Sequence, residues 1–150
     1  MWREFCLATG VTGEPVDVFP FGLSAEEADS LGGLVLHGPK RATAGLVADF
    51  EADGTPLPQV GDHNVFVLGD GHPGGVLRTT DIRIGPLSSV DAEFAWDEGE
   101  GDRSLDYWLE AHRDYCRRRC ESLGLPYSED VQMAFERFEL VWPSRAQSLP

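Results

Sequence analysis

Lysine occurs once in this chain, at Lys40, and that amine is the first residue with a chemical implication. All the other basic residues are arginines, although lysine and arginine together number 12. Arginine stays protonated at any ordinary pH, whereas a desolvated lysine can lose its proton. A hydroxyl follows three residues later, at Thr43. The spacing permits two interpretations: a base beside a nucleophile, or a lysine that caps the C-terminal end of a helix stopped at Gly38.

A second group of reactive side chains lies at residues 98–102, which read Glu-Gly-Glu-Gly-Asp. Glu98 and Glu100 are candidate acid–base carboxylates if the fold places them in a dry pocket. In the alternative interpretation both belong to a flexible acidic loop in solvent. The sequence alone leaves these two interpretations open.

Aromatic and cationic residues on either side of these two segments provide the groups that bind a nucleobase, which needs a stacking face and hydrogen bonds. Trp96 and Tyr107 are candidate stacking faces, whereas Trp108 is predicted to be core because it shares a helix stripe. Arg41 and Arg103 are candidates for holding a ribose or a phosphate. Either arginine can instead form a surface ion pair, which usually contributes less than about 1 kcal/mol.

His112, Cys116 and Cys120 recur every four residues and therefore share one helix face. The spacing fits three zinc ligands or a cysteine–histidine nucleophilic pair, but it also fits a packed apolar stripe. No Cys-x-x-Cys pair accompanies them, so packing is favoured. We predict neither a metal nor a cofactor.

Composition limits the class of protein. The 150 residues predict one domain, and 41% hydrophobic residues suffice for a core. Three cysteines indicate no disulfide framework, and no apolar run is long enough for a signal peptide or a membrane span. We therefore predict a soluble, cytoplasmic protein. The formal net charge of −14 opposes binding of long nucleic acids but allows a local pocket for a nucleoside or nucleotide.

Hydrophobic periodicity and breakers predict the order of the elements. Residues 1–20 carry little regular signal, because Gly10, Gly13 and Pro15 oppose a helix. Three helices are predicted. The first begins at the cap Ser24 and ends near His37, and the second covers 90–96 with Ser88 or Ser89 as its cap. The third covers 105–122 and has an apolar stripe at Trp108, Ala111, Tyr115 and Leu123. The predicted strands are 16–19, 42–50, 63–68, 75–84 and 131–141.

Consecutive strands with segregated helices predict an α+β fold with a curled or barrel-like sheet of about five to six strands and flanking helices. The domain core is expected over about 17–143, and 144–150 form a loose tail.

Several of these segments together resemble the ASCH domain family of the PUA-like superfamily. They are Gly-Pro-Lys-Arg-Ala-Thr-Ala at 38–44, Pro-Gln-Val-Gly-Asp at 58–62, and the run from Glu93 to Trp108. The resemblance implies a PUA-like β-barrel over roughly residues 17–143.

Small bacterial ASCH proteins are amidohydrolases that remove the acetyl group from N4-acetylcytidine, using a lysine, a threonine three residues later and a glutamate. The resemblance carries these roles to Lys40, Thr43 and Glu98, with Glu100 as the alternative carboxylate. In this hypothesis Lys40 takes the proton of Thr43, and Glu98 protonates the leaving amine. The other family members imply a non-catalytic module that binds a nucleotide or short RNA, or a ribonuclease. We expect no membrane partner, and the oligomeric state stays open.

Overall fold

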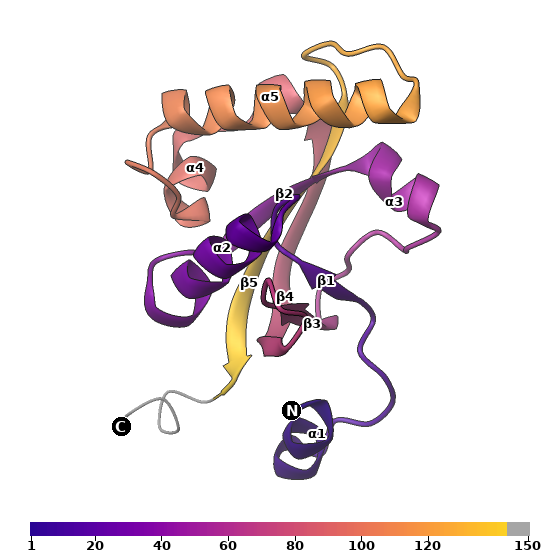
Figure 1. The fold of residues 1–150 in the computed structure, drawn as a ribbon, viewed down its shortest axis with the longest axis vertical. Helices are drawn as coiled ribbons and strands as arrows, with labels where there is room; N and C mark the ends of the chain where they lie inside the picture. Colours follow the sequence, from indigo (N-terminus) through magenta and orange to yellow (C-terminus); the bar gives the residue numbers. More distant parts are fainter. Residues whose placement is uncertain (144–150) are drawn as a thin grey trace.

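The computed structural model describes residues 1–143, and the predicted tail at 144–150 lies outside them. Figure 1 shows a curled sheet with helices around it. The helices are α1 (Trp2–Thr9), α2 (Ala25–His37), α3 (Val47–Asp53), α4 (Ala92–Glu98) and α5 (Leu105–Leu123). The strands are β1 (Val18–Pro20), β2 (Ala42–Leu46), β3 (His63–Val67), β4 (Pro73–Pro86) and β5 (Gln132–Trp142), with a 3₁₀ turn at Leu87–Ser89. The predicted α+β class and curled sheet are confirmed.

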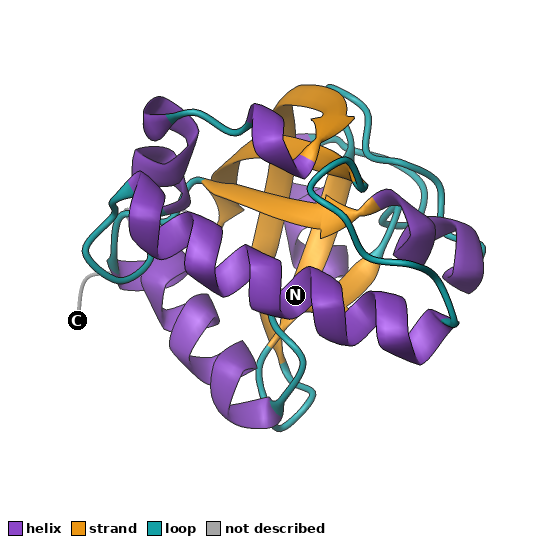
Figure 2. Cartoon of the chain, turned by 90° about the horizontal axis from the view of Figure 1, so that it is seen from above, coloured by secondary structure: helices purple, strands orange, loops and turns teal. Residues whose placement is uncertain are grey.

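The five strands form one sheet in the order β1-β3-β4-β5-β2. β1 pairs with β3 in parallel, and the other three pairings are antiparallel. β4 pairs with β5 over most of its length, with register shifts at Val76/Leu77 and Thr79/Asp81. Such irregularities bend strands, and they accompany the curl that Figure 2 shows from above. β2, which carries Thr43, therefore pairs with β5 at one edge of the sheet.

Helix α5 begins at Leu105, as predicted, and ends at Leu123, one residue after the predicted end. The Ser104 hydroxyl accepts a hydrogen bond from the Tyr107 N–H at 3.0 Å, and Gly124 ends the helix in the left-handed region at φ 68°. Its inward face differs from the predicted stripe, because Ala111, Tyr115 and Leu123 are only partly buried. The buried line is Trp108, His112, Cys116 and Cys120.

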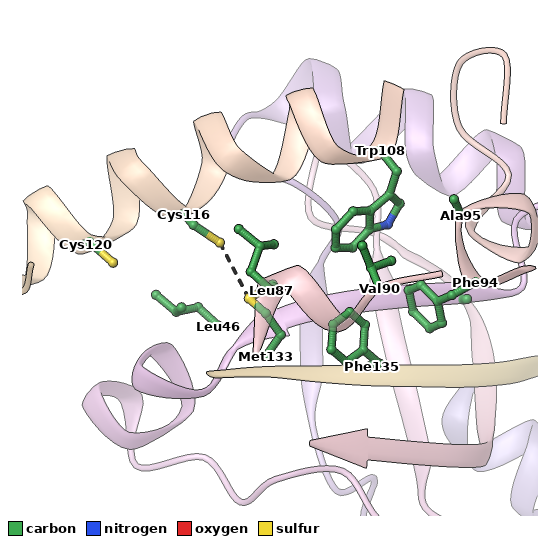
Figure 3. Close-up of a cluster of buried hydrophobic side chains, with 11 residues drawn as sticks. Leu46, Leu87, Val90, Phe94, Ala95, Trp108, Cys116, Cys120, Met133 and Phe135 are labelled. Carbon is green, nitrogen blue, oxygen red and sulfur yellow. Dashed lines mark hydrogen bonds between the residues drawn. The ribbon is translucent and has the colours of Figure 1, made fainter. Parts of the chain in front are cut away.

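Two core clusters lie against the sheet around the site. The first lies under α4 and α5 and contains Trp108, Cys116, Phe94, Phe135 and Met133 among others (Figure 3). The second joins the sheet to α2 through Phe21, Val35, Phe66, Leu77 and Phe138. We call the sheet face that α2 covers the α2 face.

The N-terminal segment contains a helix that the sequence analysis missed. The breakers Gly10 and Gly13 follow α1 and end it, with Gly10 in the left-handed region at φ 79°. Phe5 is buried, with its ring 5.4 Å from that of His63 and 6.3 Å from that of Trp142. Packing against distant residues thus stabilises this short helix.

The predicted strand at 42–50 was correct only as far as Leu46, after which the chain forms α3. The Asp49 carboxylate accepts hydrogen bonds from Tyr115 at 2.9 Å and Arg119 at 2.6 Å. The Phe50 ring folds back over Gly45, where a Cβ would lie 2.8 Å from it. These tertiary contacts favour the turn over a longer strand.

The helix predicted at 90–96 is α4, and two details of that prediction were wrong. Its N-cap is Asp91, whose carboxylate accepts from the Phe94 N–H at 2.8 Å, instead of Ser88 or Ser89. It extends to Glu98, which is buried and not part of a flexible loop.

Within residues 1–143, no helix is long and apolar enough to cross a membrane.

Candidate active site

Lys40 is buried, with 1% of its surface exposed, directly after α2. Its ammonium donates to the Ala42 carbonyl at 2.9 Å, the Glu98 carbonyl at 3.4 Å and Glu100 Oε1 at 2.6 Å. It also lies 3.5 Å from Glu98 Oε1. The side chain does not cap α2, because the backbone N–H groups of Gly38 and Lys40 bond to the Leu34 carbonyl instead. The structure therefore brings the Lys40 segment and the acidic segment together.

Gly99 allows this approach between segments about 60 residues apart. Its φ is 71°, and a Cβ there would lie 2.8 Å from the backbone nitrogen of Lys40. The Arg41 N–H also donates to the Asp97 carbonyl at 2.8 Å. A side chain at position 99 would push the two backbones apart, so the Glu-Gly-Glu pattern has a structural reason.

Glu98 is surrounded by donors, with 2% of its surface exposed. Its Oε2 accepts a hydrogen bond from Trp108 Nε1. Its Oε1 lies 3.2 Å from His112 Nε2 and 3.5 Å from the Lys40 ammonium. Burial by itself raises a carboxyl pKa, but the charges of His112 and Lys40 and these hydrogen bonds lower the pKa of Glu98 to about 2. Glu98 is thus an ionised carboxylate whose two oxygens already face three donors, and it cannot donate a proton near neutral pH.

His112 is held between two acceptors. Its Nδ1 lies 2.9 Å from the Trp108 carbonyl, and its Nε2 faces the Glu98 carboxylate. Both partners accept hydrogen bonds, so the geometry favours the doubly protonated imidazolium. Burial lowers a histidine pKa, but the charge of Glu98 and its hydrogen bond outweigh it, and the pKa of His112 is raised. The ring stacks on Trp108 at 3.8 Å between centroids.

The raised pKa of His112 predicts a pH dependence of stability. The folded state binds the His112 proton more tightly than the unfolded state does. The resulting contribution to the free energy of unfolding is complete below the ordinary pKa near 6.5, and it is lost as the pH rises through the raised pKa of the folded state. We expect His112→Gln to lower the unfolding free energy by about 1–3 kcal/mol at pH 6, and by less at higher pH. Urea unfolding of both proteins at several pH values measures the gap. A gap that does not change with pH would contradict the charged histidine.

Thr43 lies on β2 and lines a cavity of about 760 Å³. Among residues 1–143, this hydroxyl has no hydrogen-bond partner. The cavity is also lined by Lys40, Glu98, Glu100, Tyr107 and His112. A hydroxyl, an ammonium and partly exposed Glu100 thus share one space, which is large enough for a small ligand.

Three predicted binding residues lie outside the cavity lining formed by the described chain: Arg41, Trp96 and Arg103. The Arg41 guanidinium donates to the carbonyls of Val35 and Lys40. The Arg103 guanidinium stacks on Trp96 at 3.7 Å, and its Nε donates to the Trp96 carbonyl at 2.8 Å. Of the predicted binding residues, Glu100 and Tyr107 face the cavity.

Cys116 and Cys120 belong to the packed face of α5. Cys116 Sγ lies 3.5 Å from Met133 Sδ within the first core cluster (Figure 3). Burial raises the pKa of Cys116 to about 12, which opposes a nucleophilic thiolate. In the part of the chain that the structure describes, no three His, Cys, Asp or Glu side chains are placed to hold a metal ion.

Two polar residues that sequence reasoning missed also line the cavity: Asn64 on β3 and Glu136 on β5. Asn64 is 6% exposed and Glu136 is 8% exposed. The alternation of each strand could have identified them, because side chains two residues apart lie on the same face of a strand. Asn64 lies two residues before the core residue Phe66, and Glu136 lies two residues before the core residue Phe138. A polar or charged residue on the buried face of a strand is a candidate for function.

A family model described as the ASCH domain matches residues 17–142. The chain belongs to the ASCH domain family. Comparison with curated proteins finds no match.

Two solved structures share the PUA-like fold of this ASCH protein. A crystal structure of a protein from Enterococcus faecalis V583 has 30% sequence identity and a TM-score of 0.84, covering 93% of this chain and 85% of that one. The ASCH domain from Lactobacillus crispatus JV V101 has 31% identity and a TM-score of 0.82, covering 93% of this chain and 91% of that one.

Proposed function

We propose that this ASCH protein is an amidohydrolase that removes the acyl group from acylated nucleosides of the N4-acetylcytidine type. The observation that carries the proposal is that Thr43, whose hydroxyl has no hydrogen-bond partner within residues 1–143, lines the same cavity as Lys40 and Glu100. Thr43 is the nucleophile, and its acyl ester is the covalent intermediate.

The contacts of Lys40 favour a different role from that of a base. Its Nζ neighbours are oxygens that accept hydrogen bonds, so it acts as an ammonium. An ammonium that lines the same cavity as Thr43 stabilises the negative charge that develops on the acyl oxygen when Thr43 attacks. Glu98 and His112 then position this ammonium from the buried side, since Glu98 contacts both.

Glu100 is the carboxylate best placed to move protons. It is 19% exposed, lines the cavity and contacts Lys40, whereas Glu98 is saturated with donors. Glu100 accepts the Thr43 proton as Oγ bonds to the acyl carbon, and gives it to the amine as the C–N bond breaks. Glu100 next takes a proton from a water molecule as the water oxygen attacks the ester carbon. When the resulting tetrahedral intermediate breaks down, Glu100 returns that proton to the Thr43 oxygen. The products are the free amine and a carboxylic acid.

The charge of the cavity favours an uncharged nucleoside over RNA. Nine lining residues carry carboxylates, against the cations Lys40, Arg118 and Arg119 and the buried His112. Arg119 pairs with Asp49 at 2.6 Å and Arg118 with Asp114 at 3.1 Å. Each phosphate of a nucleotide or RNA would approach this lining against repulsion. The RNA-binding and ribonuclease alternatives therefore receive no support from the cavity.

Turnover of N4-acetylcytidine by the purified protein, followed as release of cytidine, tests the proposal. We expect Glu100→Gln to lower kcat by about 10²–10³-fold, because proton transfer is lost while the shape is kept. Glu139→Gln, an exposed carboxylate on β5, is the matched control and should leave kcat unchanged. Absence of turnover with any acylated nucleoside, together with salt-sensitive binding of single-stranded RNA, would overturn the proposal in favour of an RNA-binding module.

A further inference from the structure

Glu136 on β5 is a carboxyl group on the α2 face of the sheet, two residues before the core residue Phe138. It is 8% exposed and lines the cavity. The Thr79 hydroxyl donates to Glu136 Oε1 at 2.5 Å, whereas Oε2 has no hydrogen-bond or ion-pair partner within residues 1–143. Carboxyl groups this deeply buried are normally paired with a cation. Glu136 thus presents an unused acceptor to the cavity.

Two further carboxyl groups of the cavity lining, Asp62 and Asp17, lie near Glu136. The Gly61 N–H donates to the Thr79 carbonyl at 2.9 Å, and the Thr79 N–H donates to the Asp62 carbonyl at 3.0 Å. Because β4 lies between β3 and β5, Thr79 separates Asp62 from Glu136. Burial raises the pKa of Glu136, and the charges of Asp62 and Asp17 raise it further, although the Thr79 hydrogen bond opposes them. A cation bound here would relieve this repulsion.

Each of these three residues, which we call the acidic group, has one carboxyl oxygen left for a ligand. Asp17 Oδ1 accepts from the Val18 N–H at 2.8 Å, and Asp62 Oδ2 accepts from the Gln59 N–H at 2.8 Å. Single oxygens suit a compact ammonium better than the planar fork of a guanidinium. A metal ion is a poorer match, because no three His, Cys, Asp or Glu side chains of the described chain are placed to hold one.

The protein supplies no cation of its own to the acidic group. Lys40 and His112 both contact Glu98. The two arginines of the cavity lining, Arg118 and Arg119, form ion pairs with aspartates of α5 and α3. Within residues 1–143, the cations that line the cavity are therefore all paired with other carboxylates. The charge of the acidic group is left for a ligand to neutralise.

A neutral side chain beside the acidic group also has an unused polar atom. The Asp17 N–H donates to Asn64 Oδ1 at 3.1 Å, which leaves the Nδ2 group as the free end of the amide. Asn64 is 6% exposed and lines the cavity, and its Nδ2 has no acceptor among residues 1–143. Buried polar atoms are normally satisfied, so this amide independently indicates that a polar ligand completes the hydrogen bonds here.

We propose that the acidic group binds the ammonium of a small alkylamine, which donates a hydrogen bond to Glu136 Oε2 while Asp62 and Asp17 add electrostatic attraction. The same negative lining that repels phosphate attracts this cation. The site lies next to Thr43, which is the partner of Glu136 in the register of β2 and β5. The proposal goes beyond the acylated nucleosides, because binding of an amine does not require Thr43 to be a nucleophile.

Calorimetric titration of the whole protein with 1,4-diaminobutane tests the proposal, with 1,4-butanediol as the uncharged ligand of the same length. We expect one saturable site that binds the diamine at least about 10-fold more tightly than the diol. Glu136→Gln keeps an acceptor for the Thr79 hydroxyl and removes the charge, so diamine binding should weaken about 10-fold. Asp62→Asn keeps an acceptor for the Gln59 N–H, and it should weaken binding in the same direction.

The matched control is Glu139→Gln, the same substitution on the same strand, where the side chain is 47% exposed and pairs with Arg78. It changes the net charge by the same amount as Glu136→Gln, so it should bind the diamine like the wild type. Equal weakening in these two variants would show that the diamine responds only to the net charge of −14, and would overturn the site. Diol binding as tight as diamine binding, or unchanged diamine binding in both Glu136→Gln and Asp62→Asn, would overturn it as well.

Discussion

Replacing Glu98 with alanine is expected to lower the free energy of unfolding by about 3–5 kcal/mol at pH 7. The substitution leaves the ammonium of Lys40 and the imidazolium of His112 buried without the carboxylate between them. It also removes the acceptor of Trp108 Nε1. Loss of one partner from a buried charge network leaves uncompensated charge, which is the reason for the large effect.

Equilibrium unfolding in urea measures this effect, with Glu139→Ala as the control. Glu139 forms an ion pair with Arg78 in which both side chains are 47% exposed, and exposed pairs contribute less than about 1 kcal/mol. Losses of similar size in the two variants would show that the network around Glu98 contributes no more than a surface pair.

Replacing Thr43 with valine is expected to lower kcat for acylated nucleosides by at least about 10³-fold, because the nucleophilic oxygen is removed. The stability should change by less than about 1 kcal/mol, since the hydroxyl bonds to no other group within residues 1–143. Steady-state turnover and urea unfolding of the same preparation separate the two effects.

Thr43→Ser is the matched control, because it keeps the oxygen and removes only a methyl group. It should retain measurable turnover. If Thr43→Val hydrolysed the substrate within 10-fold of the wild-type rate, water and not Thr43 would be the nucleophile.

Local signals in the sequence were sufficient for the regular elements next to the site. The ends of α5 agree with the predicted range 105–122 to within one residue, because the caps at Ser104 and Gly124 act over only a few residues. The alternation of β3, β4 and β5 likewise predicted strands close to the observed ones. The family resemblance assigned Lys40, Thr43 and Glu98 to one site, and the structure brings the Lys40 segment and the acidic segment together.

The roles inside the site depend on tertiary contacts. Glu98 and Glu100 are indistinguishable in a Glu-Gly-Glu pattern, yet one is 2% exposed and the other 19%. The difference arises because the three partners of Glu98 come from two distant places in the chain: Lys40 after α2, and Trp108 and His112 on α5. No local rule predicts that encounter.

From the sequence alone, capping and alternation predicted α2, α4, α5 and the five strands, because these signals act locally, whereas α1 and α3 were missed. The motifs predicted the family and the residues of the site. Only the tertiary structure decided that Glu98 is a saturated carboxylate, that His112 is its partner and that Asn64 and Glu136 face the cavity. The physical reason is that burial and hydrogen bonding across 58 or 60 residues, as between Lys40 and the acidic segment, depend on how the sheet and helices pack.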